Sequence, residues 1–249
     1  MSEQPEQFTN VAEYYDALMA GVPYRLWADY IEEILRRFEF HPRTVLDVAC
    51  GTGTVSEIMA ARGYEVTGVD IAADMIDVAR RKAEKTESGV DYRVEDAASM
   101  SLGKEFDLAI SLFDSLNYIT DETHLAKAIM RVGEHLAQGG LFIFDVNTEY
   151  ALSHGFFNQT SLASYPKYVW SSSYDHATRI CTVRMVFEVE DNGKRRQFKE
   201  THVQKGYRLE ELDSMLRAAG FETIARYNAY KFKQPTRRSD RIFFVARKK

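Results

Sequence analysis

Strand-like and helix-like segments alternate from residue 44 to about residue 147, and this alternation constrains the fold more than any other feature. Strands are expected at 44–50, 64–70, 90–96, 106–113 and 139–147. Helices are expected at 23–38, 54–63, 72–85 and 121–137. This order predicts an α/β fold with a doubly wound, mainly parallel sheet that carries helices on both faces.

A different pattern follows the fifth strand. Residues 168–207 alternate with a period of two, with turn signals at Asp175-His176 and at Asp191-Asn192-Gly193, so we expect an inserted antiparallel β subdomain. A helix at 209–220 and an antiparallel strand pair at 221–232 and 241–248 close the chain. The expected organisation is one domain (1–249), with an N-terminal helical lid (1–40), a Rossmann-like core (41–150 and 206–249) and the insertion (151–205).

The segment DVACGTG, residues 47–53, turns from the first strand into a helix. The dinucleotide fingerprint needs three glycines, but Ser56 stands where the third would follow Gly51 and Gly53. The lysine of a phosphate-binding P-loop is missing as well. The loop therefore argues against an NAD-type Rossmann oxidoreductase, which stays a weaker alternative.

Two acids mark the ends of neighbouring strands. Asp70 ends the second expected strand, about 20 residues after the loop begins, where an acid accepts hydrogen bonds from a ribose diol. Asp96 ends the third strand. Asp70 could instead cap the following helix, and Asp96 could cap a turn. A diol acceptor without a phosphate cradle favours a nucleoside that carries a short amino-acid tail.

Several segments together resemble the class I S-adenosylmethionine-dependent methyltransferases. VLDVACGTGTVSEIMAARGYEVTGVDIAADMIDVARRKA resembles the family's motifs I and II, VEDAASM motif III, FDLAISLFDSLNYI motif IV and LAQGGLFIFDVNT the strand-five motif. The N-terminal YYDALMAGVPYRLWADYI is similar to a bacterial subgroup of small-molecule type. The general resemblance covers residues 44–147, and the subgroup resemblance covers almost the whole chain. One departure is Ala49, a small residue at the first glycine position of motif I.

The resemblance implies a seven-stranded methyltransferase-type sheet, S-adenosyl-L-methionine as cofactor and methyl transfer to an N or O atom of a small molecule. It also implies roles for particular residues. The cofactor-binding set is Tyr14, Trp27, Asp47, Ala49, Gly51, Gly53, Asp70, Ile71, Met75, Asp96, Ala97 and Phe113. The substrate-binding set, chosen because it follows strands four and five, is Asp114, Asn117, Tyr118 and Asn147. Within the first set, Asp47 orders the loop, Asp70 binds the ribose, and Ile71 and Met75 flank adenine.

The N-terminal segment carries Tyr14, Tyr15, Tyr24 and Trp27 close together. Aromatic faces attract cations, so we expect this segment to be a mobile lid over the sulfonium, with Gly21 as a hinge. The alternative is a helix that packs on the sheet by its aromatic face. Met75 has a similar alternative as ordinary core. The insertion is expected to shape the acceptor pocket through Tyr168, Trp170 and Arg184.

Composition narrows the remaining possibilities. A net charge of −5 argues against long contacts with nucleic acid, and only the basic stretch at 231–241 supports methylation of RNA such as tRNA. Cys50 and Cys181 show no metal-ligand spacing, and Cys50 lacks a neighbouring base for nucleophilic catalysis. No metal is expected. With no bilayer-length apolar run and no secretory signal, a reducing cytoplasm is expected. The catalytic residues and the oligomeric state stay open.

Overall fold

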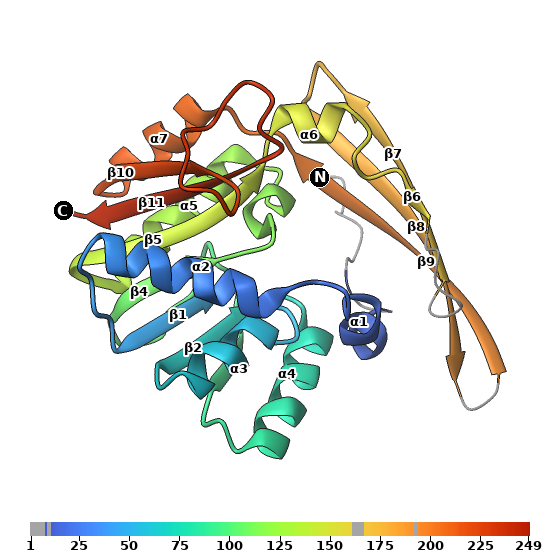
Figure 1. Cartoon of the computed structure of the whole chain (residues 1–249), viewed down its shortest axis with the longest axis horizontal. Helices are drawn as coiled ribbons and strands as arrows, with labels where there is room; N and C mark the ends of the chain where they lie inside the picture. The colour runs from blue at the N-terminus through green and yellow to red at the C-terminus, as the bar shows by residue number, and fades with distance from the viewer. Residues whose placement is uncertain (1–7, 9–10, 161–166, 192–193) are drawn as a thin grey trace.

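The structure is a computed structural model that describes residues 8, 11–160, 167–191 and 194–249. Among these residues, seven strands form a mixed sheet in the order β10-β11-β5-β4-β1-β2-β3 (Figure 1). The strands are β1 (Thr44–Val48), β2 (Glu65–Asp70), β3 (Asp91–Val94), β4 (Phe106–Ser111), β5 (Leu136–Asn147), β10 (Phe221–Asn228) and β11 (Arg241–Lys248). β11 runs antiparallel to both neighbours, β5 and β10, and the other pairings are parallel.

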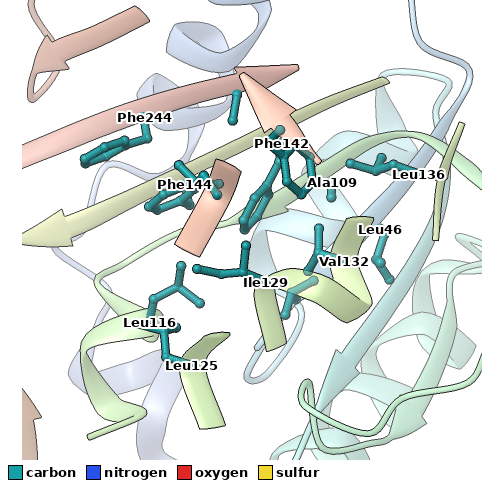
Figure 2. Close-up of a cluster of buried hydrophobic side chains, with 14 of the residues drawn as sticks. Leu46, Ala109, Leu116, Leu125, Ile129, Val132, Leu136, Phe142, Phe144 and Phe244 are labelled. Carbon is teal, nitrogen blue, oxygen red and sulfur yellow. The ribbon is translucent and has the colours of Figure 1, made fainter. Parts of the chain in front are cut away.

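Helices cover both faces of this sheet, as the alternation predicted. One face packs against α2 (Tyr24–Arg37), α3 (Thr54–Ala61) and α4 (Ala73–Thr86). The other packs against α5 (Glu122–Glu134) and α7 (Leu209–Ala218). Successive side chains of a strand point to opposite faces, so Phe142 and Phe144 of β5 join one core while Leu141 and Ile143 join the other. Figure 2 shows the first of these cores, with Phe142 and Phe144 close to Ile129 and Val132 of α5.

The insertion forms its own antiparallel sheet. Within the described residues it has the order β6-β7-β8-β9, made of β6 (Gln159–Thr160), β7 (Lys167–Asp175), β8 (Ile180–Asp191) and β9 (Lys194–Lys205). A short helix, α6 (Glu149–Ser153), leads into it. The turn after Asp175 is confirmed, whereas residues 192–193 of the other expected turn lie outside the described residues.

The N-terminal helix α1 (Ala12–Leu18) lies between this second sheet and the core (Figure 1). Val11 and Ala12 pack in one cluster with Met75 of α4 and with Cys181 and Val183 of β8. α1 therefore joins the insertion to the cofactor-binding half of the core sheet.

The predicted elements are present, but several boundaries differ by a few residues, and β4 and β5 show the physical reasons. β4 ends at Ser111, not at residue 113, because Phe113 and Asp114 have φ values of 68° and 53°, which an extended strand cannot hold. β5 begins at Leu136, since α5 already ends at Glu134. In the described part of the chain, no helix has the length and apolar character needed to span a membrane.

Candidate cofactor and acceptor site

A cavity of about 770 Å³ opens at the carboxyl ends of the parallel strands. Its wall includes the loop after β1, the end of β2, the segment after β3 and the segment after β4. β1 lies between β2 and β4: β2 and β3 follow β1 on one side of it, whereas β4 returns to its other side, so the strand order reverses at β1. Open α/β sheets bind their ligands at such a switch point. The fold therefore places the cavity where the sequence predicted a ligand.

The loop after β1 has an unusual backbone. Ala49, Gly51 and Gly53 all have positive φ, at 58°, 56° and 75°. Two features exclude a side chain at Gly53. Its positive φ disfavours one, and an added Cβ would lie 2.2 Å from the hydroxyl oxygen of Tyr92. Ala49 and Gly51 line the cavity, whereas Gly53 caps α3 next to Tyr92. The loop thus brings backbone, not side chains, close to a ligand.

Asp70 stands at the cavity wall and also holds the loop. Its two carboxylate oxygens accept hydrogen bonds from the backbone N–H groups of Gly51 at 2.8 Å and Ala72 at 2.9 Å. Burial raises the pKa of Asp70. Each carboxylate oxygen has a second lone pair, so the group can accept two further hydrogen bonds from a diol.

The residues after Asp70 and Asp96 form an apolar slot with polar edges. Ile71 is 69% exposed and lines the cavity, together with Ala97. Asp96 accepts from the backbone of Ala98 and lies 3.1 Å from Nε2 of His124. Met75 lines the cavity and also belongs to the buried cluster of α1, so both interpretations of Met75 describe its position. An exposed apolar side chain at Ile71, with Asp70 and Asp96 nearby, suits a flat ring with polar edges such as adenine.

An aromatic wall closes the cavity on another side. It consists of Tyr15, Tyr24, Trp27 and Phe113, all of which line the cavity. The rings of Trp27 and Phe113 are 5.0 Å apart, and those of Tyr24 and Trp27 are 5.3 Å apart. Tyr14, which the sequence favoured for the cofactor, points elsewhere: its ring stacks on Phe198 of β9 at 5.7 Å. Tyr15, the next residue along α1, takes the place on the wall.

Of the residues assigned to the substrate, Tyr118 lines the cavity, and the other three lie behind its described wall. Asn117 donates to the carbonyls of Asn147 and Lys205 and accepts from the backbone N–H of Asn147. Asp114 binds Arg241 and Gln204. These polar groups already satisfy one another in the interior, so their positions give no support to direct substrate contact by Asp114, Asn117 or Asn147.

The insertion approaches the site through different residues from those expected. Tyr168 and Trp170 pack beside the buried cluster of the second sheet, and Arg184 is exposed on β8. Because α1 fills the space between that sheet and the cavity, these three side chains are outside the described cavity wall. The residues of the insertion that approach the site lie on β9. They are Glu200, His202 and Gln204, and all three are buried. A polar residue at every second position, 200, 202 and 204, was a sequence signal for them.

Cys50, which the sequence showed to lack a neighbouring base, is half-buried at the cavity wall. Its side chain packs beside the core cluster of α2 and α3. Burial, followed by the negative charge of Asp47, raises the pKa of the Cys50 thiol well above its usual range. A thiol held in its neutral form is a poor nucleophile, so the surroundings of Cys50 do not favour nucleophilic catalysis.

Asp47 predicts a pH dependence of stability. Burial raises the pKa of Asp47 to about 7, and its carboxylate accepts from the hydroxyl of Ser56 at 2.6 Å. The folded chain then keeps a proton that the unfolded chain has lost above about pH 4. This contribution to stability is complete below that pH and disappears as the pH rises through 7.

We therefore expect Asp47→Asn to have a higher melting temperature than the wild type at about pH 8 and nearly the same one at about pH 4. At pH 8 the free energy of unfolding should differ by an amount on the order of a few kcal/mol. Thermal unfolding of the free protein across this range checks the effect. Asp77→Asn, an exposed change on α4, is the matched control. Parallel stability profiles for Asp47→Asn and the wild type would refute the argument.

Comparisons with known proteins identify the family of the chain. A sequence profile described as a methyltransferase domain matches residues 45–140. The chain is 30% identical over 245 residues to a provisionally named methyltransferase of Geobacillus sp. (strain WCH70). The match covers 97% of this chain and 99% of the relative. The crystal structure of an S-adenosylmethionine-dependent methyltransferase from Clostridium acetobutylicum ATCC 824 superposes with a TM-score of 0.86 at 26% identity, over 96% of this chain and 98% of that one.

A shorter match covers the core. Over 136 residues the chain is 29% identical to the dTDP-3-amino-3,4,6-trideoxy-alpha-D-glucopyranose N,N-dimethyltransferase of Streptomyces venezuelae, 54% of this chain and 56% of that protein. Fold, cavity and full-length similarity define a Rossmann-like methyltransferase. The chain belongs to the S-adenosylmethionine-dependent methyltransferases, and its cofactor is S-adenosylmethionine.

Proposed function

We propose that this methyltransferase transfers a methyl group to an N or O atom of a small-molecule acceptor. The observation that carries the proposal is the shape of the cavity. It runs from Asp70 and Asp96 past the aromatic wall to Tyr118 and Phe8, beneath α1. A cavity that side chains cover in this way suits a small acceptor better than a long polymer. The Streptomyces venezuelae relative, by its name, methylates the amino group of a nucleotide-linked sugar.

The residues present fit the cofactor. Asp70 offers free lone pairs for the ribose hydroxyls, Ile71 and Ala97 offer apolar contact to adenine, and Asp96 lies at the edge of that slot. The aromatic wall offers ring faces, which attract a sulfonium as they attract quaternary ammonium groups. When bound, S-adenosylmethionine supplies a methyl group that is already activated for transfer.

The chain itself then has to orient the acceptor and keep water away. The wall residues Tyr24, Trp27 and Phe113 pack against one another and narrow the cavity beside the loop after β1. A fixed position of the two reacting atoms can supply about 7–11 kcal/mol of the barrier reduction. Positioning is thus the main task of these residues.

One experiment tests the proposal directly. The purified protein is incubated with a metabolite extract of the cells that make it and with trideuteromethyl S-adenosylmethionine, and labelled products are identified by mass spectrometry. We expect labelled amines or hydroxyl compounds of low molecular mass. Label that appears only in added tRNA, or no label in any small molecule, would overturn the proposal.

Of the predicted lid (1–40), α2 packs in the core of the large sheet, so we propose that residues 11–24 alone act as a lid. α1 is held down by apolar contacts of Val11 and Ala12 and by a set of polar pairs. Asp16 accepts from the hydroxyl of Thr52 at 2.6 Å and lies 2.6 Å from the ammonium of Lys82. Glu13 pairs with Arg81 on the surface. Exposed pairs of this kind contribute up to about 1 kcal/mol each, so the segment can open without unfolding the core.

The lid predicts a local effect of Asp16→Ala. We expect hydrogen exchange over residues 11–24 to become faster in the free protein, and the affinity for S-adenosylhomocysteine to fall roughly three- to tenfold, because Asp16 ties α1 to the cofactor loop. The melting temperature of the free protein should change by no more than about 2 °C, since the group is partly exposed.

Glu13→Ala, which breaks the pair with Arg81 alone, is the control and should leave the affinity nearly unchanged. In the wild type, exchange over residues 11–24 should slow when S-adenosylhomocysteine binds. Strong protection of this segment in the free protein, unaffected by Asp16→Ala, would identify it as ordinary core.

A further inference from the structure

Three side chains connect the insertion to the cavity wall. Oε2 of Glu200 lies 2.7 Å from Nε2 of His202, and Nδ1 of His202 lies 3.3 Å from the hydroxyl oxygen of Tyr118. Glu200 and His202 are buried on β9, whereas Tyr118, in the 3₁₀ helix η1 (Ser115–Tyr118), lines the cavity. A carboxylate, an imidazole and a hydroxyl in series are the parts from which enzymes build a proton acceptor.

The carboxylate end of this series is held firmly. Oε1 of Glu200 accepts from the backbone N–H of Val11, and Oε2 accepts from that of Phe8, both at 3.1 Å. The ring of Phe8 covers the other two members, with centroids 4.3 Å from His202 and 5.2 Å from Tyr118. Contacts from the segment before α1 therefore fix Glu200 and help to exclude water from the imidazole.

The geometry selects one state of the imidazole. If Nε2 carries the proton and donates a hydrogen bond to Glu200, Nδ1 presents its lone pair to the Tyr118 hydroxyl. Burial, and after it the negative charge of Asp114, raises the pKa of Tyr118, so the phenol stays protonated. Tyr118 can then pass a proton to His202 but does not act as a phenolate.

We propose that Tyr118, His202 and Glu200, together called the proton relay, accept the proton of a protic methyl acceptor, either an amine or a hydroxyl compound. The proposal rests on the proposed function and names the acceptor class of the same site. Tyr118 is the catalytic residue, because it is the member of the relay that lines the cavity. His202 and Glu200 are positioning residues that act through it.

The step balances in atoms and charge. The lone pair of the acceptor N or O forms the bond to the methyl carbon, and the electron pair of the broken carbon–sulfur bond stays on sulfur. The proton of the acceptor passes to the oxygen of Tyr118 as the hydroxyl proton of Tyr118 passes to Nδ1 of His202. The cationic charge that leaves sulfur is thereby replaced by an imidazolium beside the Glu200 carboxylate.

Other charged and titratable groups face the relay and bear on its pH dependence. Besides burial, Asp114 and Glu200 raise the pKa of Tyr118, whereas a hydrogen bond with Gln204 and the charge of Arg241, behind Asp114, lower it. Tyr15 of α1 faces Tyr118 across the cavity wall. The variants below leave Asp114, Arg241 and Tyr15 in place, so a changed pH profile reports on the relay members.

The first test compares Tyr118→Phe and His202→Gln with the wild type in the labelling reaction, using the labelled small molecules of the extract as readout. We expect kcat to fall on the order of 100-fold, with the affinity for S-adenosylhomocysteine unchanged within about threefold. We also expect the rate of His202→Gln to recover as the pH rises, because the acceptor must then lose its proton to solvent. The control is Thr201→Ala, whose side chain lies on the opposite face of β9.

The second test does not depend on turnover. In protein labelled with ¹⁵N-histidine and bound to S-adenosylhomocysteine, His202 should show a proton on Nε2 and a free lone pair on Nδ1 at about pH 8, with a change at Nδ1 in Tyr118→Phe. A proton on Nδ1 in that state would overturn the relay. So would unchanged kcat and pH profiles in Tyr118→Phe and His202→Gln. Absence of label with the wild type would instead overturn the proposed function.

Discussion

Asp70→Ala should weaken the binding of S-adenosylhomocysteine by at least tenfold. The carboxylate lines the cavity and can accept two hydrogen bonds from the ribose diol, and a bond to a charged group contributes about 1.5–3 kcal/mol. The same carboxylate accepts from the N–H groups of Gly51 and Ala72, so its loss also loosens the loop after β1. Isothermal titration calorimetry on the free protein measures the change.

A control separates binding from folding in this experiment. Asp77→Ala removes an acid from the same region, on α4, where its exposed side chain pairs only loosely with Arg80 at 3.7 Å. That variant should bind S-adenosylhomocysteine as the wild type does. If a folded Asp70→Ala protein also binds with unchanged affinity, the ribose lies elsewhere and the assignment of the cavity is wrong.

The core sheet could be predicted because its information is local. Most strands between Thr44 and Asn147 are short apolar runs, and helix-like segments follow the first, second and fourth of them, so a parallel arrangement follows from connection rules. The position of Asp70 at a strand end followed in the same way. What the strand pattern could not give was the positive φ of Phe113 and Asp114, because that turn is imposed by contacts with residues distant in the sequence.

Those distant contacts also explain why some of the predicted site residues lie away from the cavity wall. Asn117 and Asn147 follow strands four and five, as substrate-binding residues do, yet each satisfies the polar groups of the other in the interior. Tyr14 and Tyr15 are neighbours on one helix, and only the packing of α1 against Phe198 of β9 decides which ring faces the cavity. Which side chains face the cavity depends on how the insertion packs against the core. The spacing of residues along the chain does not encode that packing.

The buried network behind Phe113 shows what such a contact contributes. The guanidinium of Arg241 on β11 binds Asp145 of β5 and lies 2.6 Å from Asp114. Asp145 accepts from the backbone N–H groups of Phe113 and Asp114, at 2.7 Å and 2.9 Å. Arg241 therefore neutralises two buried carboxylates and fixes the turn that places Phe113 on the aromatic wall.

Arg241→Met should for that reason destabilise the protein by about 3–5 kcal/mol, since it leaves buried carboxylates without a cation. For a chain of this size the melting temperature should fall by roughly 10 °C. Arg237→Met, an exposed change in the same connection between β10 and β11, is the matched control and should leave the melting temperature nearly unchanged.

The loss from Arg241→Met should also depend on pH. Burial raises the pKa of Asp114 to about 6 even with Arg241 present, and the guanidinium lowers it. Without that cation the folded-state pKa rises further, so the folded variant gains more by taking up a proton at low pH than the wild type does. Thermal unfolding should therefore show a smaller difference between variant and wild type at about pH 5 than at about pH 8. A loss that is the same at both pH values, or one no larger than that of Arg237→Met, would mean that the two aspartates do not need Arg241 for their burial.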